Sequence, residues 1–80
     1  MSAPSIAAIQ RAVCQYYGIT LERMLCHRRD RRWARPRQVA MYLAWEMTNC
    51  TFPQIGRAFD RDHSTVMYAV MKIEDLRARQ

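Results

Sequence analysis

The sequence predicts a small all-α domain of about five helices (four to six), and three observations support this prediction. Apolar residues recur at spacings of three and four along most of the chain, whereas no alternating pattern typical of a strand persists beyond a few positions. The 80 residues include only 2 Gly and 3 Pro. Half of them are apolar, which is typical of one folded domain over residues 1–80 rather than of a disordered tail.

The first two helices are predicted from their end signals. Ser5 is a favourable N-cap for a helix with apolar residues at helical spacing, and Gly18 ends that helix. Thr20 then caps a short helix that runs from Leu21 to about Leu25.

The start of the third helix is predicted from Pro36, because proline is favoured in the first turn. Residues 26–36 are therefore expected to form a basic loop before it. The helix is expected to end near Thr48, and its inner stripe consists of Val39, Ala40, Leu43 and Met47.

Residues 51–73 carry the pattern of a helix-turn-helix. Thr51 and Gln54 form a capping box around a proline, so a short helix starts there. Asp60-Arg61-Asp62 makes the turn, and Asp62 caps the last helix. Gly56 has no side chain, which allows another helix to approach closely. Two short helices packed in this way leave the second exposed, where it can enter a DNA major groove. The predicted inward positions are Ile55, Ala58, Phe59, Val66, Ala69, Val70, Ile73 and Leu76.

The positive charge is concentrated in one segment. The chain has 13 Lys and Arg against 7 Asp and Glu, a net charge of +6, and the whole excess lies in residues 23–37, with seven arginines and one acid. A solvated loop is the ordinary interpretation of such a run. The use of arginine without lysine, and Trp33 within the segment, favour an arm that contacts a polyanion such as nucleic acid.

Catalytic and metal sites find little support in the sequence. Cys14, Cys26 and Cys50 form no C-x-x-C pair, so neither a disulfide framework nor a zinc ribbon is indicated, and a reduced cytoplasmic protein is expected. Cys26-His27 is an adjacent nucleophile and base, but neighbouring side chains point apart and a chain this short leaves no room for a deep pocket. A zinc site from these residues and His63 fails on spacing. We expect no enzyme activity, no metal and no cofactor.

Three blocks of the sequence match one known family. They are residues 55–66 (IGRAFDRDHSTV), 34–43 (ARPRQVAMYL) and 15–19 (QYYGI). With these blocks the chain resembles, over about residues 6–77, the C-terminal DNA-binding domain of DnaA, the bacterial replication initiator. The resemblance implies a helix-turn-helix fold like that of DnaA domain IV and Trp repressor, and sequence-specific binding to duplex DNA at a site of the DnaA-box type.

The resemblance implies that the two DNA grooves are read at once. An arginine of the basic loop enters the minor groove, where the negative potential of narrow tracts attracts it, and the recognition helix enters the major groove. Asp62 can both cap its helix and accept from the amino group of cytosine or adenine. A merely exposed or packed His63 is the alternative to a base contact. The positions carried over for base contact are Arg29, Phe52, Pro53, Asp62, His63 and Ser64, and those for phosphate contact are Arg28, Arg31, Arg37, Gln38, Arg61, Thr65 and Lys72.

The phosphate role of Arg37 and Gln38 has its own physical argument. Both are expected in the first turn of the third helix, where unpaired backbone N–H groups favour an anion.

Several positions depart from the family pattern. Phe52 replaces a smaller aliphatic residue, Ser64 replaces threonine, and Trp45 stands where many members have a basic residue. The turn before Arg61 is one residue shorter than in many members, with Asp60 where glycine is usual. The preferred DNA sequence is therefore expected to differ from that of other members.

The 80 residues contain no G-x-x-x-x-G-K-[ST] motif, so we expect no bound nucleotide. No apolar stretch of 18 residues predicts a membrane span. The expected protein is cytoplasmic and nucleoid-associated, and binds DNA as a monomer. It is either an excised initiator domain or a small free-standing regulator, and the divergent positions favour the second.

Two other functions remain open. One is a DNA-binding adaptor without sequence readout. The other is a protein-interaction module, whose partner-facing surface would consist of Trp45, Met67, Tyr68 and Met71.

Overall fold

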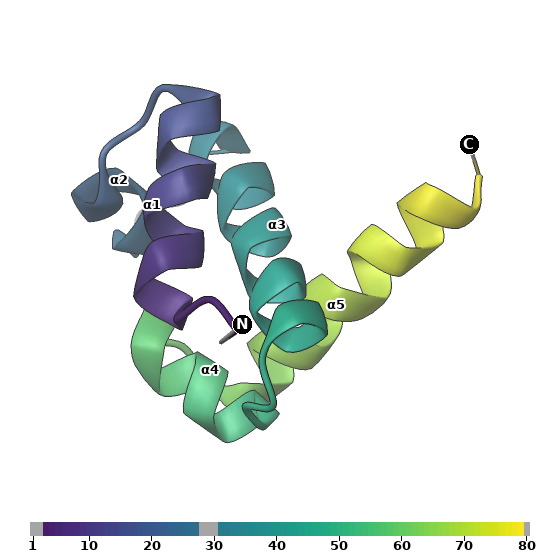
Figure 1. Ribbon diagram of the computed structural model, residues 1–80. Coiled ribbons are helices and arrows are strands. Elements are labelled where there is room, and N and C mark those ends of the chain that lie inside the picture. The colour runs from purple at the N-terminus through teal and green to yellow at the C-terminus, as the bar shows by residue number, and fades with distance from the viewer. Residues whose placement is uncertain (1–2, 28–30, 80) are drawn as a thin grey trace.

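The computed structural model describes residues 3–27 and 31–79, and this part of the chain forms five helices without a strand. α1 and α3 lie side by side and antiparallel, α4 lies across one end, and the C-terminal half of α5 extends beyond the other helices (Figure 1). The predicted all-α fold is confirmed. The helices are α1 (Ile6–Tyr17), α2 (Leu21–Leu25), α3 (Arg31–Met47), α4 (Phe52–Phe59) and α5 (His63–Ala78).

Three helix starts follow the capping residues in the sequence. The Ser5 hydroxyl accepts a backbone N–H of α1 at 3.1 Å, and Gly18 ends this helix with a φ of 69°. The Thr20 hydroxyl caps α2 in the same way. At α4, Thr51 and Gln54 exchange backbone-to-side-chain hydrogen bonds of 2.8 and 3.3 Å, which completes the predicted capping box.

The start of α3 differs from the prediction. The helix begins at Arg31, so the second half of the predicted basic loop 26–36 is helical and Pro36 lies in the second turn. Proline there lacks the N–H that would donate to the Arg32 carbonyl, and its ring crowds that carbonyl. The Pro36 ring is buried, and its packing offsets part of this cost. Trp33 anchors the added turn, because it is half-buried and the guanidinium groups of Arg23 and Arg32 lie 5.4 and 4.9 Å from its ring.

The core lies where α3 packs against each of the other four helices. The predicted inner stripe of α3 is partly wrong, because Met47 is 47% exposed and Met41 is buried in its place. Helices cover α3 on more than one side, so its buried face is broader than one stripe. The side chains with no exposure are Met24, Ala40, Ala44, Ile55, Phe59 and Val66.

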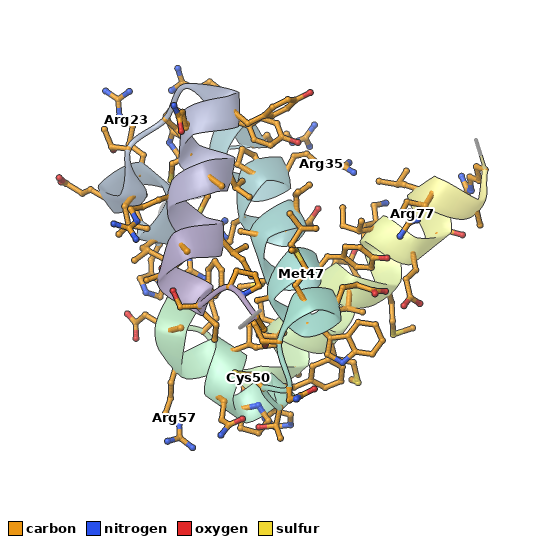
Figure 2. All side chains as sticks on the ribbon, viewed as in Figure 1. Arg23, Arg35, Met47, Cys50, Arg57 and Arg77 are labelled. Atoms are coloured by element: carbon orange, nitrogen blue, oxygen red, sulfur yellow. The ribbon has the colours of Figure 1, made fainter. Side chains whose placement is uncertain are left out.

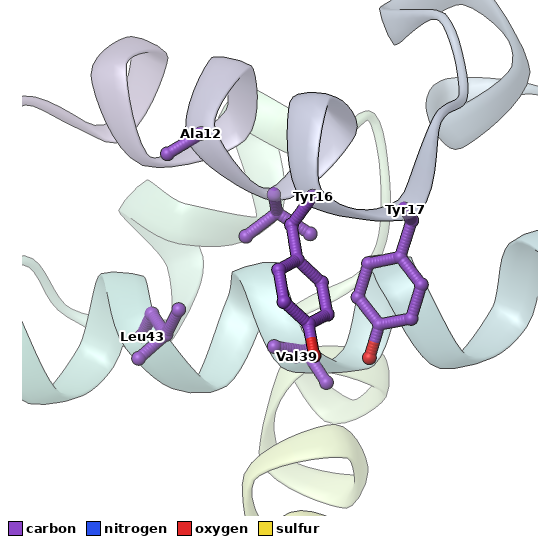
Figure 3. Close-up of a pocket in the computed structure, with 6 residues that line it drawn as sticks. Ala12, Tyr16, Tyr17, Val39 and Leu43 are labelled. Carbon is purple, nitrogen blue, oxygen red and sulfur yellow. The ribbon is translucent and has the colours of Figure 1, made fainter.

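An apolar groove of about 310 Å³ lies between α1 and α3. Val39 and Leu43 form its floor on α3, and Tyr16 and Tyr17 extend over it from α1 (Figure 3). The two tyrosine rings meet edge to face at 5.2 Å. This groove explains why Val39 and Leu43 are only half-buried.

Within the described ranges, every helix is too short or too polar to span a lipid bilayer.

Candidate nucleic-acid interface

The turn between α4 and α5 is built around Gly56. The Arg61 N–H donates to the Gly56 carbonyl at 2.8 Å, and Asp60 ends α4 with a left-handed φ of 54°. A Cβ on Gly56 would stand 2.5 Å from the Arg61 carbonyl oxygen, so a larger residue would displace the turn. The close approach predicted at Gly56 exists, but its partner is the turn and not another helix.

The exposed start of α5 presents Asp62, His63, Ser64 and Thr65. The Asp62 carboxylate accepts from the Ser64 hydroxyl at 3.0 Å, and its other oxygen lies 3.0 Å from His63 Nδ1. Hydrogen bonds, first from the Ser64 hydroxyl and then from the His63 backbone, lower the pKa of Asp62 below its ordinary value. Ser64 and His63 therefore hold an ionised acceptor at this surface.

The predicted side-chain cap at Asp62 is wrong. Asp62 occupies the N-cap position of α5 with extended backbone angles, but its side chain makes no capping hydrogen bond. The carboxylate turns instead to the Ser64 hydroxyl and the His63 ring, whose bonds to its two oxygens replace the capping bond to a backbone N–H.

A hollow of about 250 Å³ lies between the first half of α3 and the start of α5. Arg37 and Gln38 line it from α3, and Arg61 and Thr65 from the turn and α5, so four predicted phosphate-contacting residues surround one concavity. Tyr68 also lines it and is 62% exposed. Sequence reasoning assigned Tyr68 to a protein-facing surface, although its i+3 spacing from Thr65 places the two residues on one helix face.

Arg37 uses its guanidinium group within the protein. Its Nη1 donates to the carbonyls of Met24 and Cys26 at 3.1 and 3.2 Å. These carbonyls belong to the end of α2, where they lack an intrahelical donor. Burial, and then the proximity of Arg61, lower the pKa of Arg37.

Because α3 begins at Arg31, Arg37 and Gln38 lie in its second turn. The predicted support from unpaired first-turn N–H groups is therefore wrong for both residues.

Arg61 binds the same end of α2. Its Nη2 donates to the Cys26 carbonyl at 2.7 Å, and its Nη1 to the carbonyls of Leu25 and Phe59 at 3.2 and 3.1 Å. Two arginines thus converge on one carbonyl, that of Cys26.

The start of α4 presents an aromatic pair. The half-buried Phe52 ring stacks on Trp45, with 6.1 Å between centroids and 27° between planes. Pro53, the next residue, is exposed. Two predicted base-contacting residues therefore stand beside an aromatic surface to which Trp45, 37% exposed, contributes.

The structure describes some of the remaining basic residues that were predicted to contact DNA, but not all of them. Arg31 is exposed at the first position of α3, and Lys72 is half-buried on α5. Arg28 and Arg29, the latter assigned to the minor groove, lie outside the described residues. Figure 2 shows Arg23 and Arg35 extending from the end of the bundle opposite to Arg57 on α4.

The part of the chain that the structure describes holds neither a metal-binding cluster nor a disulfide. Three or more His, Cys, Asp or Glu side chains do not gather there as metal ligands. No disulfide links Cys14, Cys26 and Cys50.

A tightly closed turn, an exposed polar start of α5 and arginines beside it define a DNA-binding domain of the helix-turn-helix class. A family model described as bacterial dnaA protein helix-turn-helix matches residues 6–73. The chain belongs to this DnaA helix-turn-helix family.

Curated relatives agree with the family match. The chain is 55% identical over 74 residues to the chromosomal replication initiator protein DnaA of Sphingopyxis alaskensis. The matched segment covers 91% of this chain and 16% of that protein. It is 53% identical over 72 residues to the DnaA of Bartonella quintana, with 89% and 15% covered. It is 52% identical over 75 residues to that of Cereibacter sphaeroides, with 92% and 16% covered. The chain thus spans 15–16% of the length of these relatives.

Proposed function

We propose that this domain recognises a specific duplex DNA site of the DnaA-box type, without catalytic chemistry. The observation that carries the proposal is the hollow between α3 and α5. It brings Arg37 and Gln38, at the end of the arginine-rich segment, to the same concavity as Thr65 and Tyr68 of the recognition helix. The names of the relatives, chromosomal replication initiators, support a site of that type.

In this proposal α5 reads the major groove through its first turn. The Asp62 carboxylate accepts from the amino group of cytosine or adenine, and Ser64 and His63 fix its orientation. The Ser64 hydroxyl oxygen can still accept from a neighbouring base, and the other ring nitrogen of His63 can contact a base edge. Phe52 and Pro53 contact thymine methyl groups from the start of α4. Arg29 is proposed for the minor groove, next to Arg28 and Arg31.

The phosphate contacts are proposed to divide into two groups. Arg28, Arg31, Gln38, Thr65 and Lys72 contact the backbone directly. Arg37 and Arg61 are already bonded to α2 carbonyls and add positive potential at the hollow.

The domain is proposed to act as a monomer on the chromosome. Bound at such a site, it anchors a longer initiator chain or competes with initiators for the site.

The direct test is selection of bound sequences from random duplex DNA at moderate salt. We expect one enriched motif, and a fall in affinity of roughly three decades between about 50 and 200 mM salt for about six phosphate contacts. His63→Ala and Arg29→Ala should weaken binding to the enriched site far more than to a shuffled duplex. Arg57→Ala, an exposed arginine on α4, is the matched control and should change neither. Failure to enrich any motif would leave only nonspecific binding.

A protein-interaction role is the second candidate, because large apolar side chains are exposed on α5. Met67, Tyr68 and Met71 are 43%, 62% and 61% exposed. Ionic strength separates the two functions, since an apolar protein interface responds little to salt whereas DNA binding responds steeply.

A further inference from the structure

Arg61 links the turn of the helix-turn-helix to the segment that leads into the basic loop. Its backbone N–H is bonded to Gly56 at 2.8 Å, which fixes its position against α4. Its guanidinium reaches the carbonyls of Leu25 and Cys26 at 3.2 and 2.7 Å, 36 and 35 residues away in sequence. One side chain therefore ties two elements that the sequence keeps far apart.

A second contact joins the same two segments. His27 Nε2 lies 2.9 Å from the Asp60 carboxylate, so neighbouring residues of the turn hold neighbouring residues at the end of α2. Both of these side chains are largely exposed, at 62% and 85%, so the contact between His27 and Asp60 is the weaker of the two links. The half-buried Arg61, with several carbonyl acceptors, carries most of the attachment.

We infer that Arg61 is a positioning residue that sets the spacing between the basic loop and the recognition helix. The inference rests on the proposed function, because this spacing matters only when both elements read the same duplex. The basic loop and the recognition helix can contact their two grooves together only if their separation matches that of the grooves. A small displacement of either element weakens both sets of contacts strongly. The planar fork of arginine can bond two carbonyls at once, whereas the ammonium of lysine cannot reproduce this geometry.

Arg61→Lys separates positioning from a phosphate contact. Lysine keeps the positive charge and binds phosphate, so a residue that only contacts the DNA phosphates should tolerate the change. A positioning residue should not, because the bonds to Leu25 and Cys26 are lost.

The experiment measures Kd for the enriched duplex and for a shuffled duplex of the same composition, over a range of salt. For Arg61→Lys we expect the salt slope and the Kd for the shuffled duplex to remain within about twofold of the unmodified protein, while the enriched duplex is bound about tenfold more weakly. Arg57→Lys, on the exposed face of α4, is the control and should match the unmodified protein. An unchanged preference in Arg61→Lys, or equal weakening on both duplexes, would overturn the inference.

A double-mutant cycle with Arg29→Ala tests whether Arg61 acts through the basic loop. If it does, Arg61→Lys should have little further effect on the preference once Arg29 is removed. Additive losses would contradict the inference.

Asp60→Asn provides a second route if Arg61→Lys lowers the helix content seen by circular dichroism. Asparagine tolerates the left-handed backbone at this position and replaces the carboxylate that His27 contacts with a neutral amide, which weakens this contact. We expect a loss of preference of about twofold to threefold in the same direction, and an unchanged preference would count against the positioning role. If the unmodified protein itself enriches no motif, the proposed function fails; if it does and both variants match it, only the positioning role fails.

Discussion

Phe52 on α4 stacks on Trp45 on α3, with 6.1 Å between the ring centroids, so the two helices meet through a pair of aromatic rings. Each side chain therefore supplies a packing partner for the other.

We expect the two rings to be energetically coupled. In a double-mutant cycle of Phe52→Leu and Trp45→Ala, the coupling should be about 0.5–1.5 kcal/mol in the free energy of unfolding. Urea unfolding of the four proteins measures it. Phe52→Leu combined with Tyr16→Ala, whose ring lies on α1, is the control and should be additive. Additivity of the Phe52 and Trp45 changes would show that their stacking contributes nothing.

Gly56→Ala should destabilise the domain by about 1–3 kcal/mol, because the new methyl group would overlap the Arg61 carbonyl. Gly18→Ala is the comparison: no atom lies within 4 Å of its Cβ, but its φ of +69° is strained for alanine. Both should lower the urea midpoint. Only Gly56→Ala should also lower the preference for the enriched duplex, since only it shifts the recognition helix. Equal DNA binding by both variants would argue against a displaced turn.

Arg37→Ala should lower stability by about 1–2 kcal/mol, because two carbonyls at the end of α2 lose a charged donor that is partly exposed to solvent. Its effect on DNA should be similar for enriched and shuffled duplexes, as positive charge near the backbone is lost without a base contact. Thermal unfolding and fluorescence anisotropy measure the two effects. Arg35→Ala, an exposed neighbour on α3, should leave stability nearly unchanged.

Cys14 should be the slowest of the three cysteines to react with an alkylating reagent. Burial raises the pKa of the Cys14 thiol, so the reactive thiolate is scarcer at any given pH below that pKa. Peptide mass spectrometry after timed exposure at pH 8 should show Cys50, which is half-buried, modified before Cys14. In urea, where the protein is unfolded, Cys14 and Cys50 should react at similar rates. A Cys14 that reacts as fast as Cys50 in the folded protein would contradict its burial.

Helix ends were predictable where the signal is local. Ser5, Thr20 and Thr51 each bond a backbone N–H three residues ahead, so the capping pattern is complete within four residues of sequence. The start of α3 was not predictable in this way. Its extra turn depends on the burial of Pro36 and on the contact between Trp33 and Arg23, a residue of another helix.

In the candidate site too, features set by local sequence were predictable, whereas contacts between distant residues were not. The exposed polar start of α5 follows from its spacing relative to the buried stripe, and it was predicted. The bonds of Arg37 and Arg61 to the end of α2 were missed, because these acceptors are carbonyls 11 to 36 residues away. Every residue has a backbone carbonyl, so the sequence does not mark which one is the partner. The cap at Asp62 failed because Ser64 and His63, both nearby, offered its carboxylate other partners.

α3 packs against all four other helices, and the buried side chains of the described residues form one continuous cluster. Exposing the whole backbone of α3 therefore requires all four neighbours to detach. We expect the amide protons of Ala40 and Ala44 to exchange with solvent only through complete unfolding of the domain. The loss of the DNA-reading surface and the loss of the scaffold would then be a single cooperative event, so the domain has no folded state in which its recognition helix is present but unsupported.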